Sequence, residues 1–308
     1  MSRHRSKHTR ARSQVPTDET VGTCIERVAR QLARHPLVYG HGTENPLDEA
    51  AALVFAACGY EHDQAPEAYQ WTVSAAARTQ LETWVHRRLH DRVPSAYLTG
   101  MTSFAGEWYR TDPRALIPRS PLAEVILESF HPFIHADRVK RVLDIGTGSG
   151  CIAIAIAKQF PQAQVDAVDV SAQALELARV NAQRLGVAER VRFMQSDVYS
   201  ALDEHRYDII ISNPPYVPKA VVDGLPKEYQ HEPRSGLEAG EDGLSIVTTI
   251  LEHAHRFLNP KGLLLVEVGE TAEAVMAHYA DLPFLWLSFH NGGDGVFLLT
   301  REQCPHGR

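Results

Sequence analysis

Apolar residues recur at helical spacing over the first third of the chain. Three segments between about Glu19 and His90, "ETVGTCIERVARQLAR", "PLDEAAALVFAACG" and "SAAARTQLETWVHRRLH", place apolar side chains three and four positions apart. This spacing gathers apolar side chains on one face of a helix. It predicts a small helical domain over residues 19–100.

The next stretch is predicted to connect two domains. Alternating and aromatic residues around Ser103 to Ile117 are typical of a β-hairpin, which we expect to form a connector over residues 101–118. A helix should start near Ser120 and Pro121, because proline is favoured in the first helical turn. The remainder, residues 119–303, is the predicted catalytic domain.

From Arg141 onward, strand-like and helix-like segments alternate. The predicted strands are "RVLDIG", "QVDAVDV", "VRFMQSD", "YDIIIS" and "GLLLVEVG". Helices are expected over Cys151–Gln159, Ala172–Leu185, Gly243–Leu258 and near Ala272–Tyr279. This alternation is typical of an α/β protein with a parallel, doubly wound sheet. "LWLSFH" and "GVFLLT", joined through "NGGDG", should add an antiparallel edge.

Composition points to an ordinary globular protein. The chain has 308 residues, of which 44% are hydrophobic, which is enough for two domains with a sizeable core. It has no apolar run near the roughly 18 residues of a membrane helix, and its first residues lack the apolar part of a secretory signal. We therefore expect a cytoplasmic protein without a membrane partner. The four cysteines show no C-x-x-C spacing, so no metal site is expected.

Charge is distributed unevenly along the chain. The net charge of −7 argues against a protein coated with nucleic acid. Residues 1–18 nevertheless form a predicted disordered tail, whose first twelve residues carry five cations and no acid: Arg3, Arg5, Lys7, Arg10 and Arg12. This tail is either a solvated extension or an electrostatic arm that contacts RNA.

A glycine-rich loop follows the first predicted strand of the catalytic domain. "DIGTGSG" places Asp144 ahead of Gly146, Thr147, Gly148 and Gly150. Glycines allow a tight turn and a close approach of the backbone to a ligand. The G-x-G-x-G pattern alone also suits a dinucleotide dehydrogenase or a simple turn. An acid ahead of the loop favours the cationic end of an amino acid over a phosphate.

Acids also end the next two predicted strands. Asp169 stands where a carboxylate can accept from both hydroxyls of a ribose, and Asp197 stands where one can accept from an adenine amino group. A single aspartate at such a position is usually a turn or a helix cap. Three aspartates at successive strand ends, Asp144, Asp169 and Asp197, together with the glycine loop, indicate a ligand site.

The fourth predicted strand ends in the sequence "SNPPY". Two consecutive prolines cannot donate to a sheet and they fix φ, so Asn213, Pro214, Pro215 and Tyr216 should form a stiff loop. This loop would present an amide, exposed carbonyls and an aromatic ring. These groups suit a flat, planar nitrogen substrate.

"DIGTGSG" together with "NPPY" resembles the Rossmann-like, S-adenosylmethionine-dependent methyltransferases that act on planar nitrogens, over about Ala115 to Thr300. The resemblance implies a seven-stranded sheet and S-adenosylmethionine as cofactor. It also implies cofactor-binding and catalytic roles for two overlapping groups of residues. The cofactor-binding group is Asp144, Gly146, Thr147, Gly148, Gly150, Asp169, Asp197 and Asn213, and the catalytic group is Asn213, Pro214, Pro215 and Tyr216.

Other motifs favour one substrate branch of this family. "RVPSAYLTG" resembles the connector of protein glutamine methyltransferases, and "HEPRSGLEAGEDGL" resembles their segment bordering the substrate groove. Arg119-Ser120-Pro121 resembles the branch that methylates a glutamine of large-subunit ribosomal protein L-three. The release-factor branch carries a different run there, and it often has an aromatic residue at the position of Val198. The implied partner is L-three or a ribosome assembly intermediate.

Three alternatives to this substrate remain open at this point. A release factor is one, and an amino group of a nucleic acid is another, although the chain offers no obvious DNA-recognition domain. A ribosome-assembly factor that keeps the cofactor fold without catalysis is the third. The intact Asn213-Pro214-Pro215-Tyr216 sequence argues against this last alternative.

Overall fold

The computed structural model describes residues 19–61, 64–203 and 205–306. The chain divides into two compact units. The first unit comprises the chain up to Leu37 together with Asn45–Asp91. The second unit comprises Val38–Glu44 and the chain from Arg92 onward. The division after Asp91 falls inside the predicted range 19–100. The predicted basic tail lies outside the described residues.

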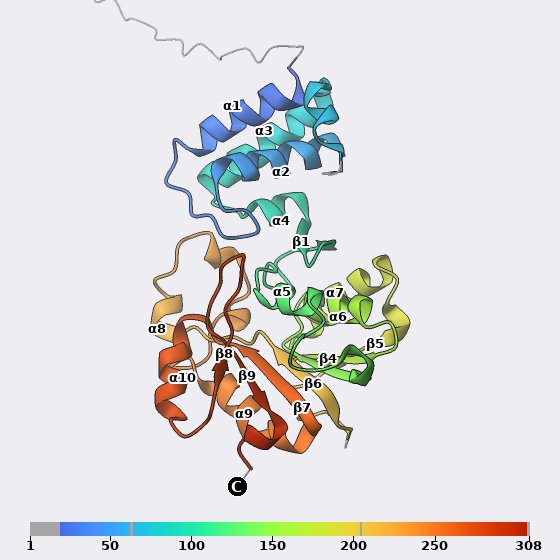
Figure 1. Cartoon of the computed structure of the whole chain (residues 1–308). Helices are drawn as coiled ribbons and strands as arrows, with labels where there is room; N and C mark the ends of the chain where they lie inside the picture. Colours follow the sequence, from blue (N-terminus) through green and yellow to red (C-terminus); the bar gives the residue numbers. More distant parts are fainter. Residues whose placement is uncertain (1–18, 62–63, 204, 307–308) are drawn as a thin grey trace, which may run out of the picture. The chain divides into compact units, whose positions relative to one another are not determined.

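Helices build the first unit, as their apolar spacing predicts (Figure 1). They are α1 (Val21–Leu32), α2 (Pro46–Cys58), the 3-10 helix Glu67–Gln70 and α3 (Ala75–His90). α2 begins with Asn45 as its N-cap and ends at Gly59, whose left-handed φ of +71° terminates the helix. The buried pair Arg88 and Glu49, 2.7 Å apart, joins α3 to α2. Losing either partner would leave an uncompensated buried charge.

The second unit continues after Asp91 with α4 (Ser95–Thr99) and a hairpin. Strands β1 (Met101–Phe104) and β2 (Glu107–Arg110) pair in antiparallel fashion. Ala105 and Gly106 connect them with φ of +48° and +79°, and two positive φ angles suit the twist of a two-residue hairpin turn. The predicted hairpin is confirmed, but it ends at Arg110 because the following segment contains prolines that cannot extend a ladder.

Seven strands form one sheet in the described part of the second unit, in the order β5-β4-β3-β6-β7-β9-β8. Their bounds are β3 (Arg141–Ile145), β4 (Gln164–Asp169), β5 (Val191–Gln195), β6 (Tyr207–Ser212), β7 (Leu258–Glu267), β8 (Leu285–Trp286) and β9 (Val296–Thr300). β3 to β7 are parallel, and β9 runs antiparallel to both β7 and β8. The predicted doubly wound sheet with an antiparallel edge is therefore confirmed.

The strand predicted from "LWLSFH" is much shorter than expected. Only Leu285 and Trp286 pair with β9 as a strand. Farther along, the backbone N–H groups of His290 and Asn291 donate to the carboxylate of Glu124 instead. The N–H of Leu287 still donates to the carbonyl of Val296, the first residue of β9, at 2.9 Å.

Helices cover both faces of the sheet (Figure 1). They are α5 (Leu122–Leu127), α6 (Cys151–Gln159), α7 (Ala172–Arg184), α9 (Ser245–Phe257) and α10 (Ala272–His278), whereas the short α8 (Lys219–Val222) has no buried residue. Successive strand residues point to opposite faces. Val142 belongs to the apolar cluster that contains α6, whereas Leu143 belongs to the cluster that contains α9. No helix in the described ranges is long and apolar enough to cross a membrane.

The strand order reverses direction between β3 and β6. From β3 the chain continues to β4 and β5 on one side, and it then crosses back to β6 on the other side. In open α/β sheets, ligands bind at the carboxyl ends of the strands that flank such a reversal. The glycine loop follows β3 and the Asn213 loop follows β6, so both lie at this point of the sheet.

Candidate active site

The glycine loop after β3 adopts a conformation that suits glycine. Gly146, Gly148 and Gly150 have φ of +71°, +54° and +83°. The N–H of Gly146 donates to the carbonyl of Val168 at 2.9 Å, which ties the loop to β4. A Cβ on Gly150 would lie 3.0 Å from the Cβ of Ala178 in α7. A side chain at Gly150 would therefore press against α7, and the positive φ would strain any other residue at Gly146 and Gly148.

Asp144, near the end of β3, is fully buried. Its Oδ2 accepts hydrogen bonds from Thr147 Oγ1 at 2.6 Å and from the N–H of Ala153 at 3.1 Å. Its Oδ1 has no hydrogen-bond partner in the part of the chain described. Burial raises the pKa of Asp144 to about 7.

The two later aspartates lie at the ends of the neighbouring strands. Asp169 Oδ2 accepts from the N–H of Gly148 at 2.9 Å, and Oδ1 accepts from the N–H of Ser171 at 2.8 Å. Each oxygen keeps a second lone pair for a ligand, and burial raises the pKa of Asp169. Asp197 lines the same cavity beside Val198, whose φ of +48° is strained for a β-branched residue.

One cavity of about 190 Å³ brings most of the predicted site residues together. Eight of them line it: Gly146, Thr147, Gly148, Asp169, Asp197, Asn213, Pro214 and Pro215. Asp144, Gly150 and Tyr216 do not line the cavity. Asp144 and Gly150 lie behind the glycine loop and support it. Tyr216 comes directly after the lining residue Pro215 in the sequence. Apolar side chains such as Ile145, Ile152 and Val198 complete this wall.

The loop after β6 presents hydrogen-bond acceptors. A Cβ on Gly146 would lie 3.9 Å from both the carbonyl oxygen of Asn213 and the Cα of Pro214, so the two loops face each other closely. Within the described ranges, the side chain of Asn213 and the carbonyls of Asn213, Pro214 and Pro215 make no hydrogen bond. These oxygens are available to a substrate that carries N–H donors.

Tyr216 sits in a pocket that the sequence did not predict. A Cβ on Gly269 would lie 2.8 Å from its ring, and a Cβ on Gly243 would lie 2.5 Å from its carbonyl. The Tyr216 hydroxyl is 3.5 Å from Glu267 Oε1, and Ser120 Oγ donates to Glu267 Oε2 at 2.5 Å. Burial raises the pKa of Glu267 to about 7 and also raises the pKa of Tyr216. The ring is therefore fixed from two sides.

A buried charge cluster joins the connector to the "HEPR" segment. Arg119 donates to both oxygens of Glu232 at 2.8 and 2.6 Å, and the N–H of Ile117 donates to the same carboxylate at 3.0 Å. Tyr229 lies under the guanidinium, and His41 Nε2 is 3.6 Å from Glu232. Burial alone would raise the pKa of Glu232, but His41 and Arg119 outweigh it and lower this pKa to about 2.

The cavity fits the cofactor that the sequence implies. On the cavity wall, Asp169 offers two acceptor oxygens to a pair of hydroxyls and Asp197 offers one to an amino group, while Asp144 holds Thr147 of the glycine loop. This set matches the adenosine part of S-adenosylmethionine. The glycine loop leaves room for the ligand to approach the backbone.

Residues 123–225 match the family model of the methyltransferase small domain. The catalytic domain of hMettl16, solved with the MAT2A 3′UTR hairpin 6, has a TM-score of 0.50 and 16% identity over 73% of this chain and 80% of that chain. This likeness shows the fold alone. Together with the site, the family match defines an S-adenosylmethionine-dependent methyltransferase.

Curated relatives identify the branch. The ribosomal protein uL3 glutamine methyltransferase of Neisseria meningitidis serogroup A is 44% identical over 270 residues, which cover 87% of this chain and 88% of the relative. The enzyme of the same name from Xanthomonas campestris pv. campestris is 42% identical over 271 residues and covers 88% of each chain. The chain belongs to the ribosomal protein uL3 glutamine methyltransferase family. The expected branch of the glutamine methyltransferases is confirmed.

Proposed function

We propose that this protein transfers the methyl group of S-adenosylmethionine to the side-chain amide nitrogen of a glutamine in ribosomal protein uL3, the L-three protein of the large subunit. The observation that carries this function is the similarity to the uL3 glutamine methyltransferase of Neisseria meningitidis over 87% of the chain. The acceptor oxygens of the Asn213 loop on the cavity wall support it. A modification of uL3 would act during ribosome assembly.

The Asn213 loop directs the nitrogen of the acceptor amide. An amide nitrogen is a poor nucleophile because its lone pair is delocalised into the carbonyl. The side-chain oxygen of Asn213 and the carbonyl of Pro214 each accept one N–H of the glutamine, which turns the lone pair toward the methyl group. The same oxygens stabilise the positive charge that develops on the nitrogen. Pro215 keeps the loop rigid, and Tyr216 packs against the planar amide.

The cofactor residues hold the other reactant in place. S-adenosylmethionine supplies, when bound, an activated methyl group on a sulfonium. Asp169 would hold its ribose hydroxyls and Asp197 its adenine amino group, while Gly146, Thr147, Gly148 and Gly150 would form the loop beneath it, which Asp144 fixes through Thr147. Asn213 belongs to both sites. After transfer, the nitrogen loses one proton to water or to a carbonyl, so the reaction needs no strong base.

The remaining parts of the chain serve substrate selection. The helical unit recognises the protein substrate, the hairpin connects it to the catalytic domain, and the basic tail contacts RNA near uL3. A cytoplasmic location agrees with a ribosomal protein as substrate. The tail lies outside the described residues, so its support is the run of cations in residues 1–18.

Methylation assays with labelled S-adenosylmethionine test this function. We expect labelling of purified uL3 with a higher kcat/KM than of a release factor, and none of duplex DNA. Replacing the acceptor glutamine of uL3 by glutamate should abolish labelling, because a carboxylate cannot donate to Asn213 and would place unpaired negative charge against it.

Each contrary result identifies a different error. Preference for the release factor would overturn the uL3 substrate, and labelling of nucleic acid would overturn the substrate class. Cofactor binding without transfer to uL3 or to an assembly particle would favour a non-catalytic assembly factor.

A further inference from the structure

One wall of the cavity belongs to no helix or strand. Residues 114–120, the connector wall, all line the cavity. They lie between the end of β2 and the start of α5, outside both elements. The glycine loop and the Asn213 loop, in contrast, continue strands of the sheet. The position of the connector wall therefore depends on contacts made from neighbouring elements.

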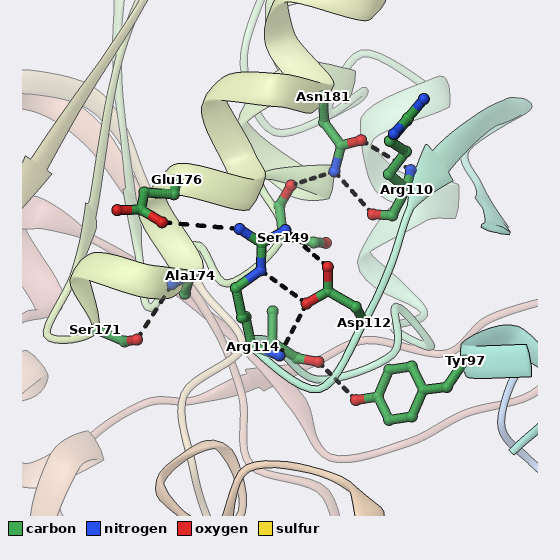
Figure 2. Close-up of polar contacts among 10 residues, drawn as sticks. Tyr97, Arg110, Asp112, Arg114, Ser149, Ser171, Ala174, Glu176 and Asn181 are labelled. Atoms are coloured by element: carbon green, nitrogen blue, oxygen red, sulfur yellow. Dashed lines mark hydrogen bonds and ion pairs between the residues drawn. The ribbon is translucent and has the colours of Figure 1, made fainter. Parts of the chain in front are cut away.

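Two side chains hold the connector wall near its ends. Asn181 of α7 is fully buried, and its Nδ2 donates to the carbonyls of Arg110 and Ser149 at 3.0 and 2.9 Å (Figure 2). Its Oδ1 accepts from the N–H of Arg110 at 2.8 Å. Arg110 is the last residue of β2, so the chain approaches the wall from a fixed point beside the glycine loop. Farther along the wall, the carboxylate of Glu232 accepts from the N–H of Ile117 at 3.0 Å.

The ion pairs at the start of the connector wall are exposed. Arg114 donates to both oxygens of Asp112, at 2.8 and 2.7 Å, and lies 3.8 Å from Glu176 of α7 (Figure 2). The exposed fractions of these three side chains are 36%, 38% and 66%. Ion pairs this exposed contribute little stability, because water and salt screen them. They are not enough to fix the wall.

Tyr97, in α4 and in the segment "RVPSAYLTG", contacts the connector wall directly. Its hydroxyl donates to the carbonyl of Ala115 at 2.7 Å (Figure 2). Burial raises the pKa of Tyr97, so this hydroxyl remains a donor at neutral pH. Ala115 packs with Ala174 and Leu177 of α7, and a Cβ on Gly148 would lie 3.9 Å from its Cβ. Tyr97 therefore holds the residue at which the wall meets the glycine loop.

We propose that Tyr97 is a positioning residue for methyl transfer, whose hydroxyl sets the connector wall against the glycine loop in the geometry that binds the cofactor. Tyr97 touches neither reactant, because it does not line the cavity. Without its hydrogen bond, the wall spends less time in the binding geometry, and the apparent affinity for S-adenosylmethionine falls by the same factor. This role rests on the proposed function through its cofactor alone. It gives a part in the reaction to the segment "RVPSAYLTG", which precedes the predicted catalytic domain of residues 119–303.

Isothermal calorimetry of Tyr97→Phe tests this role, because phenylalanine keeps the ring and lacks only the hydroxyl. One neutral hydrogen bond corresponds to about two- to tenfold in an equilibrium constant. S-adenosylmethionine should therefore bind about two- to tenfold more weakly, with unchanged stoichiometry. A loss of folded protein would instead lower the stoichiometry and leave the dissociation constant unchanged. Tyr207→Phe is the matched control: its buried hydroxyl donates to Asp166 at 2.8 Å at the start of β6, and its loss should leave the affinity unchanged.

Hydrogen exchange measures the mobility of the wall itself. The N–H of Arg114 donates to Asp112 Oδ1 at 3.1 Å, and the N–H of Ala115 donates to the carbonyl of Asp112 at 3.2 Å. Both amides should exchange about two- to tenfold faster in Tyr97→Phe than in the parent protein, whereas the amides of β3 should keep their rates. Saturation with S-adenosylmethionine should slow both amides again in the variant, because the ligand favours the binding geometry.

Two outcomes would overturn this role. Unchanged affinity in Tyr97→Phe would mean that the packing of Ala115 holds the wall without the hydroxyl, and faster exchange in β3 as well would mean that Tyr97 stabilises the whole unit. If Tyr97→Phe does not fold, Asn181→Asp replaces it, because a carboxylate cannot donate to the two carbonyls beside the wall. Unchanged affinity in that variant would refute the role of the wall. No measurement contains an acceptor protein, so a failure here is separate from any failure of the uL3 assignment.

Discussion

Replacing Glu267 by glutamine removes a buried acid beside Tyr216. Glu267 is 4% exposed, and burial raises its pKa from 4.5 to about 7. An acid whose pKa is higher in the folded protein binds more protons there than in the unfolded chain. Its contribution to stability is therefore complete below about pH 4.5 and is lost as the pH rises to about 7. At about 1.36 kcal/mol per pKa unit, this loss is roughly 3 kcal/mol.

The free energy of unfolding, measured by urea titration at pH 5 and pH 8, checks this value. From pH 5 to pH 8, the free energy of unfolding should fall by roughly 2–3 kcal/mol more in the parent protein than in Glu267→Gln, because glutamine stays neutral. Asp144 has a raised pKa in both proteins, so its contribution cancels in the comparison. Glu270→Gln, at an exposed position nearby, should behave like the parent. Equal pH dependence of Glu267→Gln and the parent would show that Glu267 is ionised in the folded protein.

Three further substitutions test the site. Asp169→Ala should weaken S-adenosylmethionine binding about ten- to a hundred-fold, and unchanged calorimetric affinity in a folded variant would remove Asp169 from the cofactor site. Asn213→Ala should lower kcat by about 10²–10³ with little change in cofactor affinity, because it removes an acceptor that directs the nucleophile. Single-turnover methylation as fast as in the parent would refute that role. Gly269→Ala places a Cβ 2.8 Å from the Tyr216 ring, so it should slow methylation without changing cofactor affinity. Methylation kinetics equal to those of the parent would mean that the position of the ring is unimportant.

The local pattern of the sequence predicts the catalytic fold well where a segment is buried on both faces. The helix expected over Cys151–Gln159 has those bounds, because glycines precede it and its small apolar residues pack between β-strands and α7. β3, β4 and β6 are apolar runs followed by the polar residues of the site. β8 is the exception, since only Leu285 and Trp286 of the predicted strand "LWLSFH" pair with β9 as a strand.

The supporting residues of the site could not be found in this way. Arg119 pairs with Glu232, and Ser120 with Glu267, across more than a hundred positions of the chain. No periodicity connects such partners, and a lone charged residue usually lies on a solvated surface. The resemblance of the "HEPR" segment predicted that it borders the substrate groove, and Pro233 and Gly236 do line the cavity. The resemblance did not predict which residues this segment contacts.

The segment Val38–Glu44 has a consequence for how this protein can be divided or recombined. It lies between α1 and α2 in the sequence, yet it belongs to the catalytic unit. There the N–H of Val38 donates to Glu228 at 3.1 Å, and His41 approaches Glu232. Cutting the chain before Arg92 would therefore take His41 away from the catalytic unit along with the helices. Exchange of helical domains between relatives must therefore keep Val38–Glu44 with the catalytic unit.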